Sequence, residues 1–155
     1  MRALERYADT IRRICFIHLK KYDDVEDVFQ EVFLKYILCD CQFESDAHEK
    51  AWLIRVAVNQ CKDTLKSFFR QNVSSLDAID LEPSYSFDDT SRQILNAVLE
   101  LPEKYRTVIY LFYYEGYTAV EIAKLLGKRE NTIYTWLTRG RLRLKERLGG
   151  DLFEG

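Results

Sequence analysis

The chain has 155 residues, 47% apolar side chains and a formal net charge of −2 at pH 7, a length that suits one ordinary domain or two very small ones. It holds no run near the roughly 20 continuous apolar residues of a transmembrane helix, and its charged N-terminus lacks the apolar core of a signal peptide, so a cytoplasmic location is expected. With only six glycines and two prolines and apolar residues mostly at helical spacing, an all-α protein is predicted.

Four cysteines are present, and in this setting they are expected to be reduced thiols. Cys39, Cys41 and His48 resemble half of a zinc site, but structural zinc takes four ligands, commonly with two to four residues between paired cysteines. One residue separates this pair and there is no second pair, so no metal or other cofactor is expected. No nucleophile constellation or phosphate-binding glycine loop is present either, so the chain is not expected to be an enzyme.

Charge divides the chain into three parts. Residues 1–70 carry 12 basic and 12 acidic side chains, residues 71–100 carry one basic and six acidic (net −5), and residues 101–155 carry ten basic and seven acidic (net +3). This asymmetry suggests a module that faces nucleic acid behind an acidic connector. The connector, "NVSSLDAIDLEPSYSFDDTS" at 72–91, has the composition of a linker, so domains are expected at 1–71 and 92–150.

The first strongly periodic segment is "DDVEDVFQEVFLKYIL", residues 23–38, and it predicts a helix that Asp23 or Asp24 caps. Its apolar stripe contains Val25, Val28, Phe29, Val32, Tyr36 and Ile37. The opposite face presents Asp27, Gln30, Glu31, Leu34 and Lys35. The pattern alone favours a solvated acidic face, and Leu34 is a mild indication of a docking surface.

The next predicted helix is "KAWLIRVAVNQCKDTLKSFFR", residues 50–70. Its core stripe contains Leu53, Val56, Ala57, Cys61, Leu65 and Phe68. A second face carries four cations and one amide, from Arg55, Asn59, Lys62, Lys66 and Arg70. That face suits a phosphate backbone, with Asn59 able to reach a base edge. The alternative, a merely soluble face, would normally intersperse glutamate with lysine.

Local chemistry after the connector predicts a helix-turn-helix. Thr118 and Glu121 have the spacing of a capping box, which starts a short helix over 119–126, and Gly127 ends it. A longer basic helix is expected to start near Asn131 or Thr132 and to run to position 149. Such a pair of helices places the second one in the major groove of DNA.

The N-terminal half of that second helix is expected to present Tyr134, Thr135, Thr138 and Arg139. Arg139 is the best candidate for a base contact, because its planar fork binds guanine bidentately. Backbone phosphates are the expected targets of the remaining cations, which are Lys128, Arg129, Arg141, Arg143, Lys145 and Arg147.

Taken together, these segments resemble the extracytoplasmic-function (ECF) sigma factors of the bacterial sigma-70 family, which are specificity subunits of RNA polymerase. "DDVEDVFQEVFLKYI" looks like a helix of region 2 of the family, and "KAWLIRVAVNQCKDTLKS" is similar to the helix that follows it. The stretch from "LPEKYR" to "RLRLKERL" looks like region 4. The resemblance covers nearly the whole chain and implies two small helical domains, a region 2 bundle and a region 4 helix-turn-helix, joined by the acidic linker.

The resemblance also implies a function without catalysis, in which the chain binds core RNA polymerase, recognises the −35 and −10 promoter elements and directs DNA melting. The implied contact with the β′ clamp helices involves Asp27, Gln30, Glu31 and Leu34, with Phe33 and Ile37 as apolar support. The unwound −10 strand would meet the loop "CQFESDAHEK" together with Arg55, Asn59, Lys62 and Lys66. The −35 duplex would meet Arg129, Tyr134, Thr135, Thr138, Arg139, Arg141 and Arg143.

Two further partners are implied for the family, the β flap of the polymerase near region 4 and an anti-sigma factor. Trp136 stands where the family often has arginine, and Gly140 where it often has alanine. The alternative hypothesis is a free-standing helix-turn-helix transcriptional regulator, with residues 1–70 as a dimerisation or ligand domain.

Overall fold

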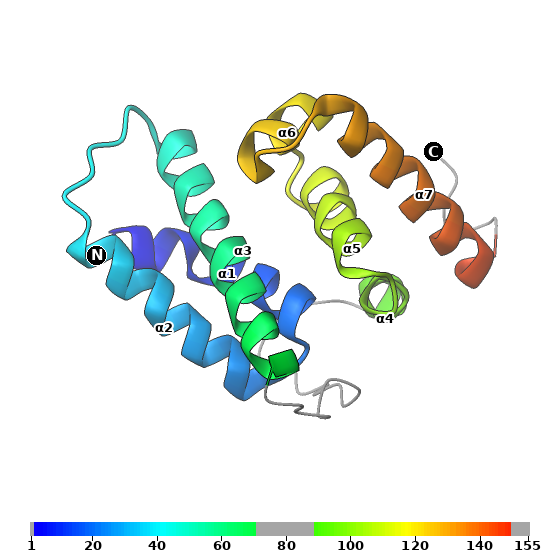
Figure 1. The fold of residues 1–155 in the computed structure, drawn as a ribbon, viewed down its shortest axis with the longest axis horizontal. Coiled ribbons are helices and arrows are strands. Elements are labelled where there is room, and N and C mark those ends of the chain that lie inside the picture. The colour runs from blue at the N-terminus through cyan, green and yellow to red at the C-terminus, as the bar shows by residue number, and fades with distance from the viewer. Residues whose placement is uncertain (1, 71–88, 150–155) are drawn as a thin grey trace. The chain divides into compact units, whose positions relative to one another are not determined.

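The structure is a computed structural model that describes residues 2–70 and 89–149, with side chains for 5–70 and 92–149. Every element in these ranges is helical, which confirms the prediction of an all-α protein. The chain divides into two compact units, residues 1–85 and 86–155 (Figure 1). Most of the predicted linker lies outside the described residues.

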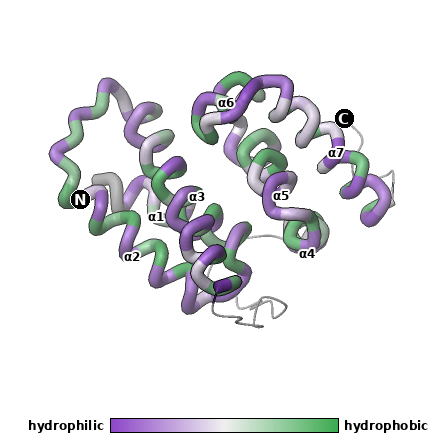
Figure 2. Tube along the Cα trace, viewed as in Figure 1, coloured by the Kyte–Doolittle hydropathy of each residue, from purple (hydrophilic) through white to green (hydrophobic). Residues whose placement is uncertain are grey.

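Unit 1 is a three-helix bundle of α1 (Arg2–Leu19), α2 (Tyr22–Leu38) and α3 (Asp46–Arg70), in which each helix packs against the other two. Bands of hydrophobic and hydrophilic residues alternate along α2 and α3, as expected of helices with one apolar face (Figure 2). The fully buried side chains of this unit include Ile11, Ile14, Ile17, Val25, Leu53 and Ile54.

Helix α1 contacts both other helices of unit 1 through polar groups as well as its core. The Arg12 guanidinium donates to both carboxylate oxygens of Glu26, at 2.9 and 3.2 Å, and lies 3.9 Å from the centre of the Phe29 ring. The Tyr7 hydroxyl donates to the backbone carbonyl of Asp46 at 3.0 Å, at the start of α3. Because α1 covers the inner sides of α2 and α3, their outer faces are exposed.

The predicted cap of α2 is wrong. The helix begins at Tyr22, and Lys21 occupies the N-cap position without a side-chain hydrogen bond. The Val25 N–H already donates to the Lys21 carbonyl at 3.0 Å, so Asp23 and Asp24 lie inside the first turn. There their charges still interact favourably with the helix dipole.

Unit 2 contains α4 (Asp89–Leu99), α5 (Glu103–Ile109), the π-helical segment η2 (Tyr110–Tyr114), α6 (Ala119–Leu126) and α7 (Glu130–Leu148). Helices α4, α5 and α6 all pack against α7. The central helix is α5, in which all side chains from Tyr105 to Ile109 are buried. Helix α7 therefore has one face in the core of the unit and the other exposed.

The predicted helix-turn-helix is confirmed. The Glu121 N–H donates to Thr118 Oγ1 at 3.1 Å and the Thr118 N–H donates to Glu121 Oε1 at 2.8 Å, which completes the capping box. Gly127 ends α6 in the left-handed conformation, with φ of 66°. Helix α7 begins at Glu130, one or two residues earlier than predicted, and Ile133 is fully buried between the helices.

The four cysteines lie in two different settings. Cys15 and Cys61 are buried thiols. The chain turns after α2 and brings the Cα atoms of Cys39 and Cys41 within 5.2 Å, so that their sulfur atoms lie against each other. At this separation the two sulfur atoms can be bonded, and for this pair the expectation of reduced thiols stays a prediction. The described parts of the chain contain no group of three or more histidine, cysteine, aspartate or glutamate side chains that could hold a metal, and no helix there is long and apolar enough to span a membrane.

Candidate nucleic-acid interface

The outer face of α2 carries the predicted docking residues. Asp27, Gln30, Glu31 and Leu34 are all exposed and recur at helical spacing, so they share one side of the helix. Leu34 is 54% exposed, and Ile37 and Leu38 extend the same face at 61% and 74%. This face combines carboxylates with an unusual density of exposed apolar groups.

Two predicted positions on α2 need correction. Phe33, expected to support docking, is 6% exposed and lies against Phe29 with ring centroids 4.7 Å apart. Ile37, expected in the core stripe, is exposed instead. The reason is that α1 and α3 both pack against α2. The buried face of α2 is therefore wider than the predicted apolar stripe and is shifted around the helix to include Phe33.

The predicted basic face of α3 also forms one exposed surface. Arg55, Asn59 and Lys66 are exposed and Lys62 is half-buried. Within the described parts of the chain, none of these four side chains has an ion-pair or hydrogen-bond partner. Three uncompensated cations and an amide on one helix face therefore remain available to a polyanion.

An aromatic cluster, which sequence reasoning missed, fixes the loop that precedes α3. The Phe43 ring stacks parallel to Tyr36 at 6.1 Å and meets Trp52 at 5.7 Å and His48 at 5.4 Å. The Tyr36 hydroxyl donates to the Glu49 carboxylate at 2.6 Å, and this hydrogen bond raises the pKa of the phenol. The aromatic composition of 36–52 was the available signal, but only the fold brings these rings together.

Helix α7 exposes all of its predicted DNA-contacting side chains, but they are not equivalent. Thr135, Thr138 and Arg139 lie on the side opposite the buried Ile133 and Leu137. Arg141 Nε instead donates to the Leu137 carbonyl at 3.3 Å. The Arg143 guanidinium lies 5.4 Å from the Tyr105 ring centre. Tyr134 is exposed on the flank of the helix opposite Arg143.

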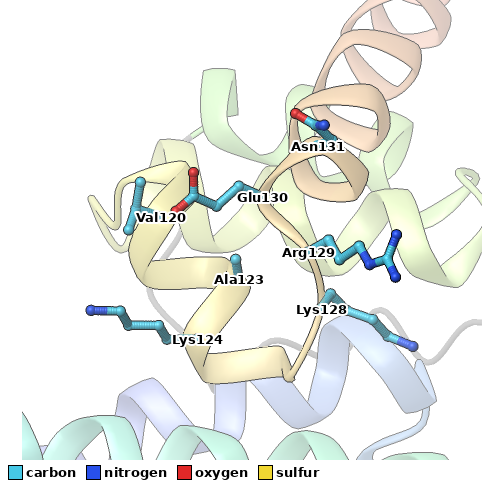
Figure 3. A pocket seen from close by; sticks show the side chains of 7 residues that line it. All are labelled: Val120, Ala123, Lys124, Lys128, Arg129, Glu130 and Asn131. Atoms are coloured by element: carbon cyan, nitrogen blue, oxygen red, sulfur yellow. The ribbon is translucent and has the colours of Figure 1, made fainter.

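Asn131 belongs to the same outer face and was not predicted. It is exposed and precedes Thr135 by four residues and Thr138 by seven, so helical spacing alone would have identified it. It lines a surface cavity of about 440 Å³ between α6 and α7, together with Val120, Ala123, Lys124, Lys128, Arg129 and Glu130 (Figure 3).

This cavity has the character of an anion site at a helix N-terminus. In Figure 3, Lys128 and Arg129 extend from the turn and Lys124 extends from α6. The first backbone N–H groups of α7 have no intrahelical acceptor and carry the positive end of the helix dipole. Glu130 opposes this charge, so the residues that line the cavity include three cations and one carboxylate.

Comparison with known proteins identifies both units. Residues 3–70 match the family model "Sigma-70 region 2" and residues 91–144 match "Sigma-70, region 4". The ECF RNA polymerase sigma factor SigW of Bacillus subtilis is 27% identical over 92% of this chain and 84% of its own length. The ECF RNA polymerase sigma-E factor of Escherichia coli is 32% identical over 76% of this chain and 70% of its own length.

The fold has a solved counterpart as well. The sigma factor RpoE of Bartonella quintana, crystallised in complex with the anti-sigma factor NepR, superposes with a TM-score of 0.80 at 23% identity, covering 97% of this chain and 96% of that one. Because both units match in order and the Escherichia coli relative exceeds 30% identity over most of its length, the chain belongs to the sigma-70 family of RNA polymerase sigma factors, within the ECF group.

Proposed function

We propose that three exposed faces of this sigma factor, on α2, α3 and α7, each have a separate binding role. The protein binds core RNA polymerase and directs promoter recognition, and the role proposed for it is recruitment and recognition without catalysis. The observation that carries the proposal is the presence of two basic faces on separate units. A free-standing regulator would need only the face on α7 and leaves the one on α3 unexplained.

The domain assignment follows from these faces. Residues 1–71 are proposed to bind core polymerase and the −10 element, residues 72–91 to form the acidic linker, and residues 92–150 to bind the −35 element. On α2, Asp27, Gln30, Glu31 and Leu34 would contact the β′ clamp helices. Ile37 is exposed as the apolar support expected for that contact, and exposed Leu38 takes the place of the buried Phe33.

On α3, the cations Arg55, Lys62 and Lys66 would follow the phosphates of the unwound −10 strand, with Asn59 among them to bind a base edge. The preceding loop adds Phe43, whose ring is half-buried, because bases of single strands stack readily on aromatic side chains. Taking a base out of the duplex costs a few kcal/mol, and contacts made only to the open strand offset that cost. Capture of the strand would thereby stabilise melted DNA.

On α7, Thr135, Thr138 and Arg139 would face base edges of the −35 duplex, with Tyr134 beside them. Arg129, Arg141 and Arg143 are assigned to backbone phosphates, and the cavity at the start of α7 offers Arg129 a favourable place for one. For the β flap we propose the exposed aromatic pair Tyr113 and Tyr114 on η2. Both rings are exposed on unit 2 and combine apolar area with a hydroxyl group that can hydrogen-bond to a partner.

Regulation by an anti-sigma factor stays a prediction from the resemblance. Such a protein would have to compete with core polymerase for the apolar part of the α2 face, which comprises Leu34, Ile37 and Leu38. Exposed apolar groups of this density favour a protein partner over solvent.

Binding to purified core RNA polymerase tests the proposal. We expect the double variant Gln30→Ala/Glu31→Ala to lose about tenfold or more in affinity, since a few central contacts dominate most interfaces. Both side chains are exposed and neither contributes to the core, so the fold should be unchanged by circular dichroism.

The matched control is Asp9→Ala, which removes an exposed carboxylate from α1 instead of α2. Asp9→Ala should bind core polymerase as tightly as the unmodified chain. If the unmodified chain fails to bind core polymerase, or if both variants bind equally well, the proposed role of the α2 face is wrong.

A further inference from the structure

The Cys39–Cys41 pair lies where two functional segments of unit 1 meet. Cys39 forms the C-cap of α2, with its N–H donating to the Lys35 carbonyl at 2.9 Å. Cys41 follows in the loop 39–45 that leads to α3. Their Cα atoms are 5.2 Å apart, well within the range of about 4.4–6.8 Å that a disulfide can bridge. The backbone separation therefore permits a bond between the two sulfur atoms.

The pair is accessible to small molecules, unlike the other two cysteines. Cys41 is exposed and Cys39 is half-buried, whereas Cys15 and Cys61 are both 0% exposed. Thiol–disulfide exchange requires access to the attacking thiolate and to the sulfur it attacks. Of the four cysteines, only this pair meets that requirement in the folded chain.

A bond across a single residue constrains the loop and not the fold. The stabilisation that a disulfide provides by restricting the unfolded chain grows with the number of residues in the closed loop, and here the loop is minimal. Unit 1 is instead held by its buried core and by the contacts of Arg12 with Glu26 and Phe29. Both the dithiol and the disulfide forms are therefore compatible with the folded bundle.

The segment that the bond does constrain carries Phe43, two residues after Cys41. Phe43 packs against Tyr36 of α2 and Trp52 of α3, and the loop leads directly into the helix with the basic face. When the bond is formed, the chain between α2 and Phe43 loses freedom. The state of the cysteine pair thus bears on how well ordered the loop is.

We propose that Cys39 and Cys41 form a reversible thiol–disulfide exchange site whose oxidant is a low-molecular-weight disulfide. The Cys41 thiolate attacks one sulfur of that disulfide, which forms a mixed disulfide and releases one small thiol. The Cys39 thiolate then attacks the Cys41 sulfur and releases the second small thiol. Two protein thiols and one small disulfide become one protein disulfide and two small thiols, and an excess of a reducing dithiol reverses the sequence.

This exchange regulates the loop, and the consequence for DNA rests on the proposed function of unit 1. The disulfide form holds the loop in the arrangement with Phe43 packed, so less conformational entropy is lost when a strand binds. Fixing roughly one residue in advance predicts about fivefold tighter binding of single-stranded DNA by the disulfide form. The chemistry of the site itself does not depend on that role.

The exchange is tested on the full chain with oxidised glutathione, dithiothreitol and iodoacetamide. After reduction, alkylation of the folded chain should modify Cys39 and Cys41 and spare Cys15 and Cys61, as read by peptide mass spectrometry. After treatment with oxidised glutathione, all four should be protected until the chain is unfolded and reduced. Cys39→Ser should stop at the mixed disulfide and retain glutathione on Cys41. Equal alkylation in the two states, or loss of the small thiol from Cys39→Ser, would overturn the site.

The effect on the loop is tested with a labelled single-stranded DNA of random sequence at low salt. The disulfide form should bind more tightly than the dithiol form, and Cys39→Ser/Cys41→Ser should show no response to either reagent. Equal binding by the two forms would overturn the regulation while the alkylation result stands. Absence of strand binding in both forms, with normal alkylation, would instead count against the proposed −10 role.

Discussion

At the scale of single residues, Gly140 shows how α7 is held in place. Glycine inside a helix is less favourable than alanine by about 1 kcal/mol, so its presence at the middle of α7 needs a compensating reason. A Cβ atom at this position would lie 2.9 Å from Ile109 Cγ1 and 3.1 Å from Ile109 Cδ1. Ile109 is itself 3% exposed on the central helix α5. The missing side chain is therefore what allows α7 to approach α5 closely.

We predict that Gly140→Ala destabilises the protein despite the better helix propensity of alanine. The close contact involves Cγ1 of a β-branched residue, which has little rotamer freedom, and overpacking a core typically costs about 1–3 kcal/mol. The expected net loss is up to about 2 kcal/mol in the free energy of unfolding, measured by urea denaturation followed by circular dichroism.

Ile109→Ala provides the matched test of that contact. Alone it should cost about 2–5 kcal/mol through the cavity it leaves, but combined with Gly140→Ala the two losses should be less than additive, because the new methyl group occupies part of the cavity. Strictly additive losses, or a raised urea midpoint for Gly140→Ala alone, would show that the contact does not limit the approach of the helices.

At the scale of secondary-structure elements, α6 depends on its caps to an unusual degree. A helix of eight residues is too short to be stable by itself, and it sets the position of the turn before α7. We predict that Thr118→Ala, which removes the hydroxyl that accepts from the Glu121 N–H, lowers the free energy of unfolding by about 1 kcal/mol. Thermal and urea unfolding of the full chain would measure this loss.

Thr118→Ser is the appropriate control, since serine keeps the hydroxyl and is at least as good an N-cap. Thr118 is exposed, so the alanine variant loses little packing. Equal stability of the alanine and serine variants would mean that the capping box contributes nothing measurable to unit 2.

These elements also explain why some parts of the structure could be predicted from the sequence and others could not. The bounds of α6 were predicted correctly because they depend on local chemistry, namely the capping box and Gly127. The exposure of the polar faces of α2 and α3 followed in the same way from helical spacing. The cap of α2, the buried position of Phe33 and the π-helical turn Tyr110–Tyr114 were not predicted, because contacts between helices override local preference there.

The same distinction between local pattern and contacts between helices applies to the candidate site. Exposed side chains such as Arg55, Asn59 and Arg139 follow from periodicity, and their accessibility agrees with the structure. The cluster around Phe43 and the Cys39–Cys41 pairing depend on how the chain turns between α2 and α3. Periodicity carries no information about such a turn, so these features depend on the tertiary fold.

At the scale of the whole molecule, the proposed function couples two weak DNA contacts through one chain. Each basic face alone should bind DNA weakly and with a strong dependence on salt, because its affinity comes largely from counterion release. When one face is bound, the linker raises the effective concentration of the other near the same DNA. Discrimination at the −35 element can then be weakened separately from strand capture.

Arg139 offers the sharpest test of this separation. The chain is first assembled with core polymerase into holoenzyme, and a promoter is selected from a random library by run-off transcription. Variants are then compared on that promoter. We predict that Arg139→Ala loses about 1–3 kcal/mol of discrimination against a scrambled −35 element. Arg139→Lys should lose a smaller part of it, because the lysine ammonium can still donate to guanine but lacks the planar, preorganised fork of arginine. Both variants should leave the slope of the salt dependence of promoter binding nearly unchanged, because that slope reports phosphate contacts and Arg139 is assigned to a base edge. Core binding should be unchanged in both variants. Discrimination by Arg139→Ala equal to that of the unmodified chain would exclude Arg139 as a base-reading residue.

Asn59→Ala should instead impair promoter opening, measured by permanganate reactivity, more than it impairs duplex binding, because Asn59 is assigned to the unwound strand. Equal losses of opening and duplex binding for Asn59→Ala would refute the division of labour between α3 and α7.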